Sequence, residues 1–124
     1  MKNTNTYNLG LLILRIVFSS MLLYHGIEKI DILFSSEIKF ADPIGLGPTI
    51  SLILVLIAEI ICPILIIIGV KARLASIPPI ILMLVAIFIV HKGESLLALE
   101  AAILYLAAFT SISLLGSGKY SVRR

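Results

Sequence analysis

The chain has 124 residues, of which 60% are hydrophobic and 14% are charged, and its mean hydropathy is +1.14. A soluble domain carries about 25% charged residues, and a core of this size cannot enclose so many apolar side chains, so the composition excludes a water-soluble globular domain. The net charge of +3 comes without a basic patch of interleaved aromatic residues, which argues against nucleic acid as a partner. Cys62 is the only cysteine, so an intrachain disulfide, a Cys-x-x-Cys redox pair and a cysteine metal site are excluded, and we expect no metal.

Four segments are apolar enough to cross a bilayer as helices, which takes about 20 residues each. They cover approximately residues 9–27, 48–70, 74–90 and 95–115. Helices are expected rather than strands, because an open sheet leaves unpaired edges in lipid. The third segment has Pro78 and Pro79 near its start, so it is expected to begin as a separate turn before the proline pair. The sequence therefore predicts an all-α polytopic membrane protein, with one domain over residues 1–124 that forms a four-transmembrane-helix bundle.

The N-terminal segment shares features with a signal peptide, but Arg15 interrupts its apolar run and no small-residue cleavage site follows. We expect a retained first helix. The connection over residues 28–47 is long for a small bundle, and its apolar positions suggest a short interfacial helix. Those positions are Ile32, Leu33, Phe34, Ile38 and Phe40.

The distribution of Lys and Arg predicts the orientation in the membrane, because cytoplasmic loops are enriched in these residues. One side of the predicted bundle carries six of them and the other carries three. The first set is Lys2, Lys71, Arg73, Lys119, Arg123 and Arg124, and the second is Lys29, Lys39 and Lys92. We therefore expect both termini in the cytoplasm and, in a bacterium, a location in the cytoplasmic membrane.

Ionisable side chains at membrane depth are costly, at about 2.5–3.5 kcal/mol each, and usually face the interior of a bundle. At about 1.5 Å per residue, Arg15 and Glu59 reach overlapping depths near the bilayer midplane, so we expect them to pair. The ring of Pro63 clashes with the carbonyl of Glu59, and the second helix should open there. An interhelical clamp and a ligand site explain the Arg15–Glu59 pair equally well.

A polar stripe runs along one face of the first helix at about 100° per residue. It comprises Arg15, Ser19, Leu22, Gly26 and Lys29, with His25 at its edge, while Glu28 points elsewhere. On the fourth helix, Glu100 shares a face with the small residues Ala107 and Ser111, which would permit close packing.

An outward-opening pocket is predicted where the outer ends of the helices meet. Its candidate ligand-binding residues are His25, Lys29, His91 and Glu100 around the mouth and Arg15 and Glu59 at the floor. Structural alternatives stay open: Glu100 would pair with Arg15 or Lys29, both histidines would be interfacial, and Lys29 would extend to the headgroups. Cys62 is expected to be a small buried hydrophobe.

The ordered combination of several short motifs resembles the DoxX family of small four-helix membrane proteins. The motifs are Leu-Arg15-Ile-Val-Phe18, His25-Gly26-Ile-Glu-Lys29, Ala58-Glu59, Gly69-Val-Lys-Ala-Arg73, Glu100-Ala-Ala-Ile-Leu-Tyr105 and Gly116-Ser-Gly-Lys-Tyr-Ser121. The resemblance implies a four-helix membrane fold and, for some members, a link to thiosulfate:quinone oxidoreduction or to thiol and oxidative-stress handling beside soluble enzymes. Val122, Arg123 and Arg124 follow the last motif where the family often has an acidic residue.

Two functional hypotheses lead. The first is a subunit of a redox-associated system that binds quinone or quinol through Arg15, His25 and Glu59 or Glu100. Because the chain shows no electron carrier, a partner subunit would deliver electrons. The second is a non-catalytic membrane scaffold that anchors a partner protein or forms a homo-oligomer.

A small transporter or lipid-binding protein ranks below these because no inverted repeat is visible. Haem held by His25 and His91 ranks low as well, because no c-type attachment motif is present. The sequence assigns no catalytic group.

Overall fold

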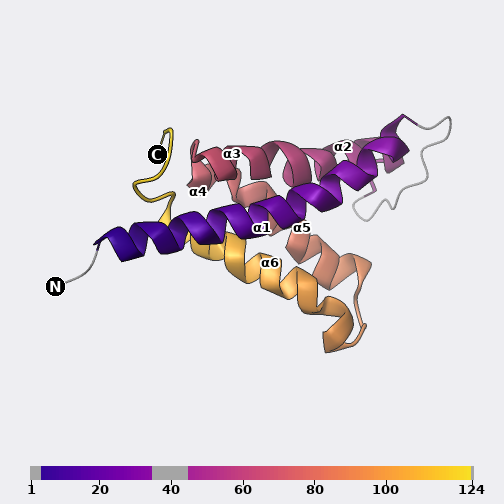
Figure 1. Cartoon of the computed structure of the whole chain (residues 1–124). Coiled ribbons are helices and arrows are strands. Elements are labelled where there is room, and N and C mark those ends of the chain that lie inside the picture. The colour runs from indigo at the N-terminus through magenta and orange to yellow at the C-terminus, as the bar shows by residue number, and fades with distance from the viewer. Residues whose placement is uncertain (1–3, 35–44, 124) are drawn as a thin grey trace.

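The computed structural model describes residues 4–34 and 45–123, and every regular element in these two ranges is helical (Figure 1). In chain order they are α1 (Thr4–Leu33), α2 (Pro48–Leu56), the π-helical η1 (Ile57–Ile61), α3 (Cys62–Ile68), α4 (Ala72–Ala75), α5 (Ile77–Val85), the π-helical η2 (Ala86–Val90) and α6 (Leu96–Leu115). Ile32 and Leu33 belong to α1 rather than to a separate interfacial helix. Ile38 and Phe40 lie outside the described residues.

Within the described ranges, these elements form four helices long and apolar enough to cross a membrane: Asn5–Leu33, Pro48–Ile68, Ala72–Val90 and Leu96–Leu115. The predicted four-helix membrane fold is confirmed. Successive helices run in opposite directions, so the start of α1 and the end of α6 lie at the same end of the bundle (Figure 1). The segment that follows α6, residues 116–123, also lies at this end, and we call it the C-terminal tail.

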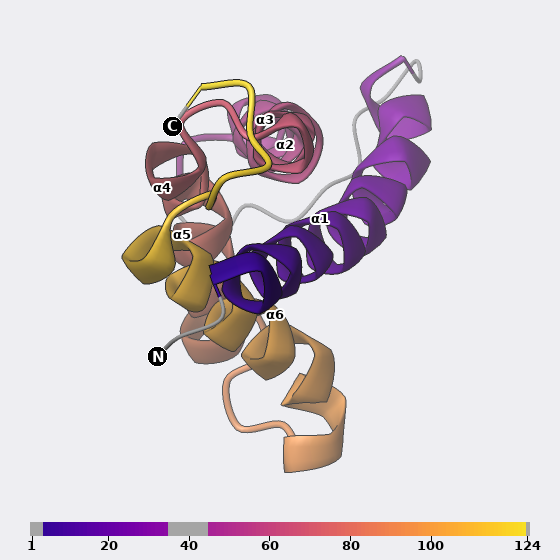
Figure 2. The same ribbon diagram turned by 60° about the vertical axis from the view of Figure 1, so that its left-hand side comes forward.

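The bundle centres on contacts that α1 makes with α3 and α6 and that α5 makes with α6 (Figure 2). The core is small and contains Leu22, Ile66, Ala72, Ala75, Met83, Tyr105, Phe109 and Ile112. Most other large apolar side chains face outward; Leu97, for example, is 82% exposed. Such an outer surface suits lipid, because a bilayer replaces water as the solvent for these side chains.

The second span contains the widened turn that Pro63 predicts. Proline has no N–H to donate to the carbonyl of Glu59, four residues earlier. The helix responds with the π-helical turn η1, in which Cys62 N–H donates to Ile57 O. Such single-turn π segments are frequent at functional sites.

The third span begins as a separate turn, as its proline pair predicts. α4 ends at Ala75, and α5 starts at Ile77 with Pro78 and Pro79 in its first turn, where a missing N–H is tolerated. The Ser76 hydroxyl donates to Ala72 O at 2.7 Å and so satisfies a carbonyl at the break.

Candidate functional site

The buried carboxylate of Glu59 pairs with Lys29. Lys29 Nζ donates to both carboxylate oxygens of Glu59, at 2.5 and 2.7 Å. The Glu59 side chain is 5% exposed and that of Lys29 is 31% exposed. Glu59 lies in η1, and Lys29 lies one turn before the end of α1. An intramembrane ion pair of this kind is a functional-site candidate by default.

The predicted pairing of Glu59 with Arg15 is wrong, and the direction of helical side chains explains why. Side chains on a helix lean toward its N-terminus. On α1, Arg15 therefore leans toward the end of the bundle that holds the C-terminal tail, whereas Glu59, on an antiparallel helix, leans the other way. Lys29 lies about 21 Å beyond Arg15 along α1, at about 1.5 Å per residue, and leans back toward Glu59.

Arg15 instead caps the end of α3. Its side chain is 0% exposed, and all its hydrogen bonds go to backbone carbonyls. Nε donates to Ile66 O at 2.9 Å and Nη2 to Ile67 O at 2.8 Å, in the last turn of α3. Nη1 donates to Ser117 O at 2.9 Å and Tyr120 O at 2.7 Å, in the C-terminal tail. The guanidinium thus joins three segments of the chain.

The remaining carbonyls at the end of α3 are also satisfied. Gly69, with φ 81°, ends the helix, and Val70 N–H donates back to Leu65 O at 2.8 Å. The tail then lies alongside, where Val122 N–H donates to Ile68 O and Arg123 N–H to Gly69 O, both at 3.0 Å. Helix ends leave such carbonyls without partners, and leaving them so in lipid costs several kcal/mol each.

Gly26 permits a close approach beside the ion pair. A β-carbon at this position would lie 2.9 Å from the Glu59 carbonyl oxygen and 2.7 Å from Ile60 Cγ1. The glycine therefore allows α1 to contact η1 directly. The predicted polar stripe on α1 is confirmed as its buried face, since Arg15, Ser19 and Leu22 are at most 1% exposed.

Two aromatic residues extend this region toward α6. Tyr105 is 7% exposed and lies within electrostatic range of the Glu59 carboxylate. Its ring packs against that of His25, with the centroids 6.2 Å apart, and against Phe18 and Phe109. His25 is exposed at the edge of the stripe, as predicted.

His91 and Glu100 do not join the ion pair. His91 is exposed, and its Nδ1 contacts Oε2 of Glu94 in the same turn. Glu100 is exposed, and no ion pair links it to Arg15 or Lys29 among the described residues. Ala107, on the same face of α6, is exposed as well, whereas the opposite face of α6 is packed against the bundle. Among the described residues, the predicted close packing through Ala107 is therefore not found.

Within residues 4–34 and 45–123, the six candidate residues do not gather around one site. Lys29 pairs with Glu59, and His25 packs against Tyr105. Arg15 donates to carbonyls of the C-terminal tail. Ligand binding by any of the six candidate residues stays a prediction. Cys62 is buried with a free thiol, as expected.

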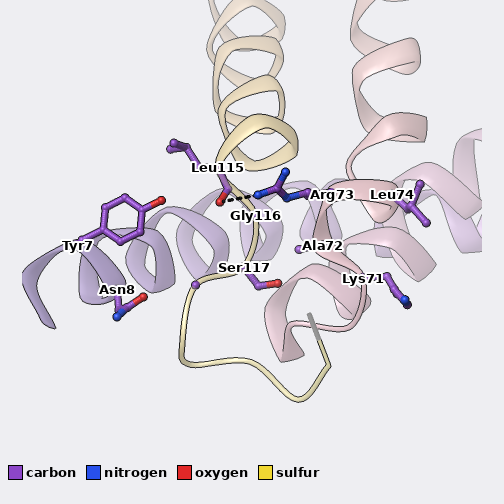
Figure 3. A pocket seen from close by; sticks show the side chains of 10 residues that line it. Tyr7, Asn8, Lys71, Ala72, Arg73, Leu74, Leu115, Gly116 and Ser117 are labelled. Atoms are coloured by element: carbon purple, nitrogen blue, oxygen red, sulfur yellow. Dashed lines mark hydrogen bonds between the residues drawn. The ribbon is translucent and has the colours of Figure 1, made fainter. Parts of the chain in front are cut away.

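Two hollows in the described part of the chain lie close to the residues discussed above. One, of about 250 Å³, is an apolar groove lined by Leu33, Ile53, Leu56, Ile57, Ile60 and Ile61. It lies beside the ion pair, because Leu33 is one turn beyond Lys29 and Ile60 follows Glu59. The other, of about 430 Å³, lies at the end of the bundle that holds the C-terminal tail, and we call it the tail cavity (Figure 3).

The sequence alone did not identify the roles of Gly69 and of the C-terminal tail. Their signals were present in the Gly69-Val-Lys-Ala-Arg73 motif and in the closing Gly116-Ser-Gly-Lys-Tyr-Ser121 motif. Glycines in these motifs adopt positive φ angles, at 81° for Gly69, 84° for Gly116 and 76° for Gly118. Such angles turn the chain back over α3.

The DoxX family model matches residues 10–92, which include the Arg15 cap and the Lys29–Glu59 pair. The match covers most of the chain. The protein belongs to the DoxX family. Searches among curated proteins and among solved structures found no match. This DoxX protein is an integral membrane protein with four helices of membrane-spanning character among its described residues.

Proposed function

We propose that this DoxX protein is a subunit of a redox-associated membrane system and binds quinone or quinol beside the Lys29–Glu59 pair. The observation that carries the proposal is this buried ion pair at the π-helical turn η1, with an apolar groove at its side. A quinone needs donors to its carbonyl oxygens and an apolar channel for its tail. Lys29 supplies a donor, and the groove supplies apolar walls for an isoprenoid chain.

Reduction of a quinone to a quinol takes up two electrons and two protons. Glu59 and Lys29 are suited to carry protons, because each changes charge by gaining or losing one. Tyr105 and His25 extend this set of polar groups toward α6. The electrons would come from a partner subunit, since the sequence contains no motif for an electron-carrying cofactor.

The test is to purify the protein in mild detergent, measure retained quinone by extraction and mass spectrometry, and titrate it with a short-chain quinone. Wild type should retain quinone, and Glu59→Gln should weaken binding by about tenfold or more, since a hydrogen bond to a charged group is worth about 1.5–3 kcal/mol. Glu28→Gln is the matched control, because it removes an exposed carboxylate from α1, the helix that carries Lys29. Equal binding by both variants, or no binding by wild type, would reject the proposal.

A second candidate is a membrane scaffold that anchors a partner protein or a second copy of the chain. The exposed face of α6 favours it, because the small side chains of Ala107 and Ser111 would allow another helix to approach closely. Cysteine crosslinking in membranes tests it with Ala107→Cys and, as a control on another helix, Leu84→Cys, both in a Cys62→Ser background. Crosslinked species with Ala107→Cys alone would support the scaffold.

We also infer that the end bearing the tail faces the cytoplasm, in a bacterial cytoplasmic membrane. The described exposed cations at that end are Lys71, Arg73, Lys119 and Arg123, in agreement with the rule that positive residues remain inside. Labelling of Gly93→Cys and Gly118→Cys, each in a Cys62→Ser background, with a membrane-impermeant reagent in intact cells tests the orientation. Only the Gly93→Cys variant should react.

A further inference from the structure

The tail cavity, of about 430 Å³, is formed by residues from three parts of the chain. Its lining is Tyr7, Asn8, Lys71, Ala72, Arg73, Leu74, Leu115, Gly116, Ser117 and Gly118. Tyr7 and Asn8 lie on α1 at one side, and Arg73 reaches across the middle toward Leu115, to whose carbonyl it donates at 3.5 Å (Figure 3). Lys71 lies on the side away from Tyr7, with its side chain directed outward (Figure 3).

The lining contains two cations and no carboxylate. Neither Lys71 nor Arg73 forms an ion pair within the described residues, where the two ion pairs are Lys29–Glu59 and His91–Glu94. The described side-chain carboxylates all lie elsewhere, on the second half of α1, in η1 and at or before the first turns of α6. The cavity therefore has a positive charge that no described side chain neutralises.

Arg15 adds a further positive charge next to the cavity. Its guanidinium is fully buried, has only backbone carbonyls as partners, and donates to the carbonyl of Ser117 in the lining. Ser117 is itself 4% exposed and lies in the lining of the cavity. A buried cation in a medium of low dielectric constant strongly favours a nearby anion.

The chemistry of the lining matches a phosphate group. Arg73 offers a planar set of N–H donors, and Ser117 offers a hydroxyl. Leu74, 69% exposed, and Leu115, 45% exposed, provide apolar surface at the rim. Tyr7, 49% exposed, lies near the start of the first span, a depth at which tyrosines meet lipid headgroups.

We propose that the tail cavity binds a phosphate-bearing group, as found on an anionic phospholipid headgroup. Arg73 and Ser117 contact the phosphate, and Arg15 stabilises it through the Ser117 peptide. Leu74 and Leu115 would contact the first carbons of the acyl chains. A soluble phosphate shares the same chemistry, and the experiment separates the two sources. This site is distinct from the Lys29–Glu59 pair and does not depend on the proposed quinone function.

The test is native mass spectrometry of the full chain in mild detergent with phosphatidylglycerol or with phosphatidylcholine. Wild type should retain phosphatidylglycerol at collision energies that remove phosphatidylcholine. Arg73→Gln should lower phosphatidylglycerol occupancy about tenfold, the loss expected for about 1.4 kcal/mol. Lys92→Gln is the matched control, because it removes an exposed cation from the turn at the opposite end of the bundle. Equal occupancy in the two variants, or no preference of wild type for phosphatidylglycerol, overturns the proposal.

Competition with inorganic phosphate distinguishes a lipid headgroup from a soluble phosphate as the ligand of the tail cavity. Displacement of phosphatidylglycerol by millimolar phosphate from wild type would show a phosphate site that a soluble ligand can fill, and resistance to displacement would show a lipid site. If Arg73→Gln does not fold, hydrogen exchange on wild type provides a second measurement. Phosphatidylglycerol should then slow exchange at residues 71–75 and 116–118 but not at residues 91–95. Uniform slowing, or none, overturns the proposal.

Discussion

Gly69 leaves the space that the guanidinium of Arg15 occupies. A β-carbon at position 69 would lie 2.7 Å from Arg15 Nη2 and 2.4 Å from the β-carbon of Ser121. The end of α3, the buried arginine and the C-terminal tail therefore fit together only because position 69 has no side chain. The packing of α1, the end of α3 and the C-terminal tail at this point therefore depends on Gly69.

Arg15→Met should destabilise the protein by about 3 kcal/mol or more, because several buried carbonyls lose their donor at about 1–3 kcal/mol each. Arg15→Lys should recover only part of the loss, because an ammonium cannot reproduce the planar donor set. Unfolding by sodium dodecyl sulfate in mixed micelles measures the difference. An Arg15→Lys variant as stable as wild type would contradict the capping geometry.

Gly69→Ala should be more damaging than Gly93→Ala. Both glycines have φ angles near 80°, at 81° and 85°, so both alanines experience similar backbone strain of about 1 kcal/mol. Only Gly69 is also crowded, since a β-carbon at Gly93 would meet nothing within 4 Å. In the same unfolding assay, the free energy of unfolding of Gly69→Ala should be lower than that of Gly93→Ala by about 1–3 kcal/mol, the usual cost of overpacking. Equal losses would show that the tail does not pack against α3.

Gly26→Ala tests the contact between α1 and η1, with Gly10→Ala as its control on the same helix. A β-carbon at Gly10 meets nothing, so Gly10→Ala should leave stability unchanged or raise it by up to about 1 kcal/mol. Gly26→Ala should lower it by about 1–3 kcal/mol, because the added carbon is pressed against the Glu59 backbone. Thermal unfolding followed by circular dichroism in detergent measures both, and the prediction is wrong if the two variants behave alike.

A double-mutant cycle with Lys29→Met and Glu59→Gln should reveal strong coupling. Each single variant leaves one partner in a largely buried position, and the double variant leaves no unpaired charge, so the losses should not add. The exposed His91–Glu94 contact, with His91→Gln and Glu94→Gln, is the comparison and should give a coupling of about 0–1 kcal/mol. A coupling for Lys29–Glu59 within that range would show that the pair is solvated rather than buried.

The sequence by itself determined the number and class of the helices, because four long apolar runs can be satisfied in lipid only as spanning helices. Local rules also predicted the break at Pro78 and Pro79, the widened turn before Pro63 and the buried stripe of α1. Each of these depends on residues within a few positions of one another along the chain.

Only the tertiary structure decided which buried charge meets which partner. The positions of Arg15 and Glu59 along their helices predicted similar depths in the membrane. Because side chains on antiparallel helices lean in opposite directions, the two side chains are separated, and Lys29 pairs with Glu59 instead. The partners of Arg15 lie 51 to 105 positions away in sequence, on carbonyls that any residue type could supply. Backbone acceptors carry no signature in the side-chain sequence, so the cap became visible only once α3 and the C-terminal tail were packed around the guanidinium.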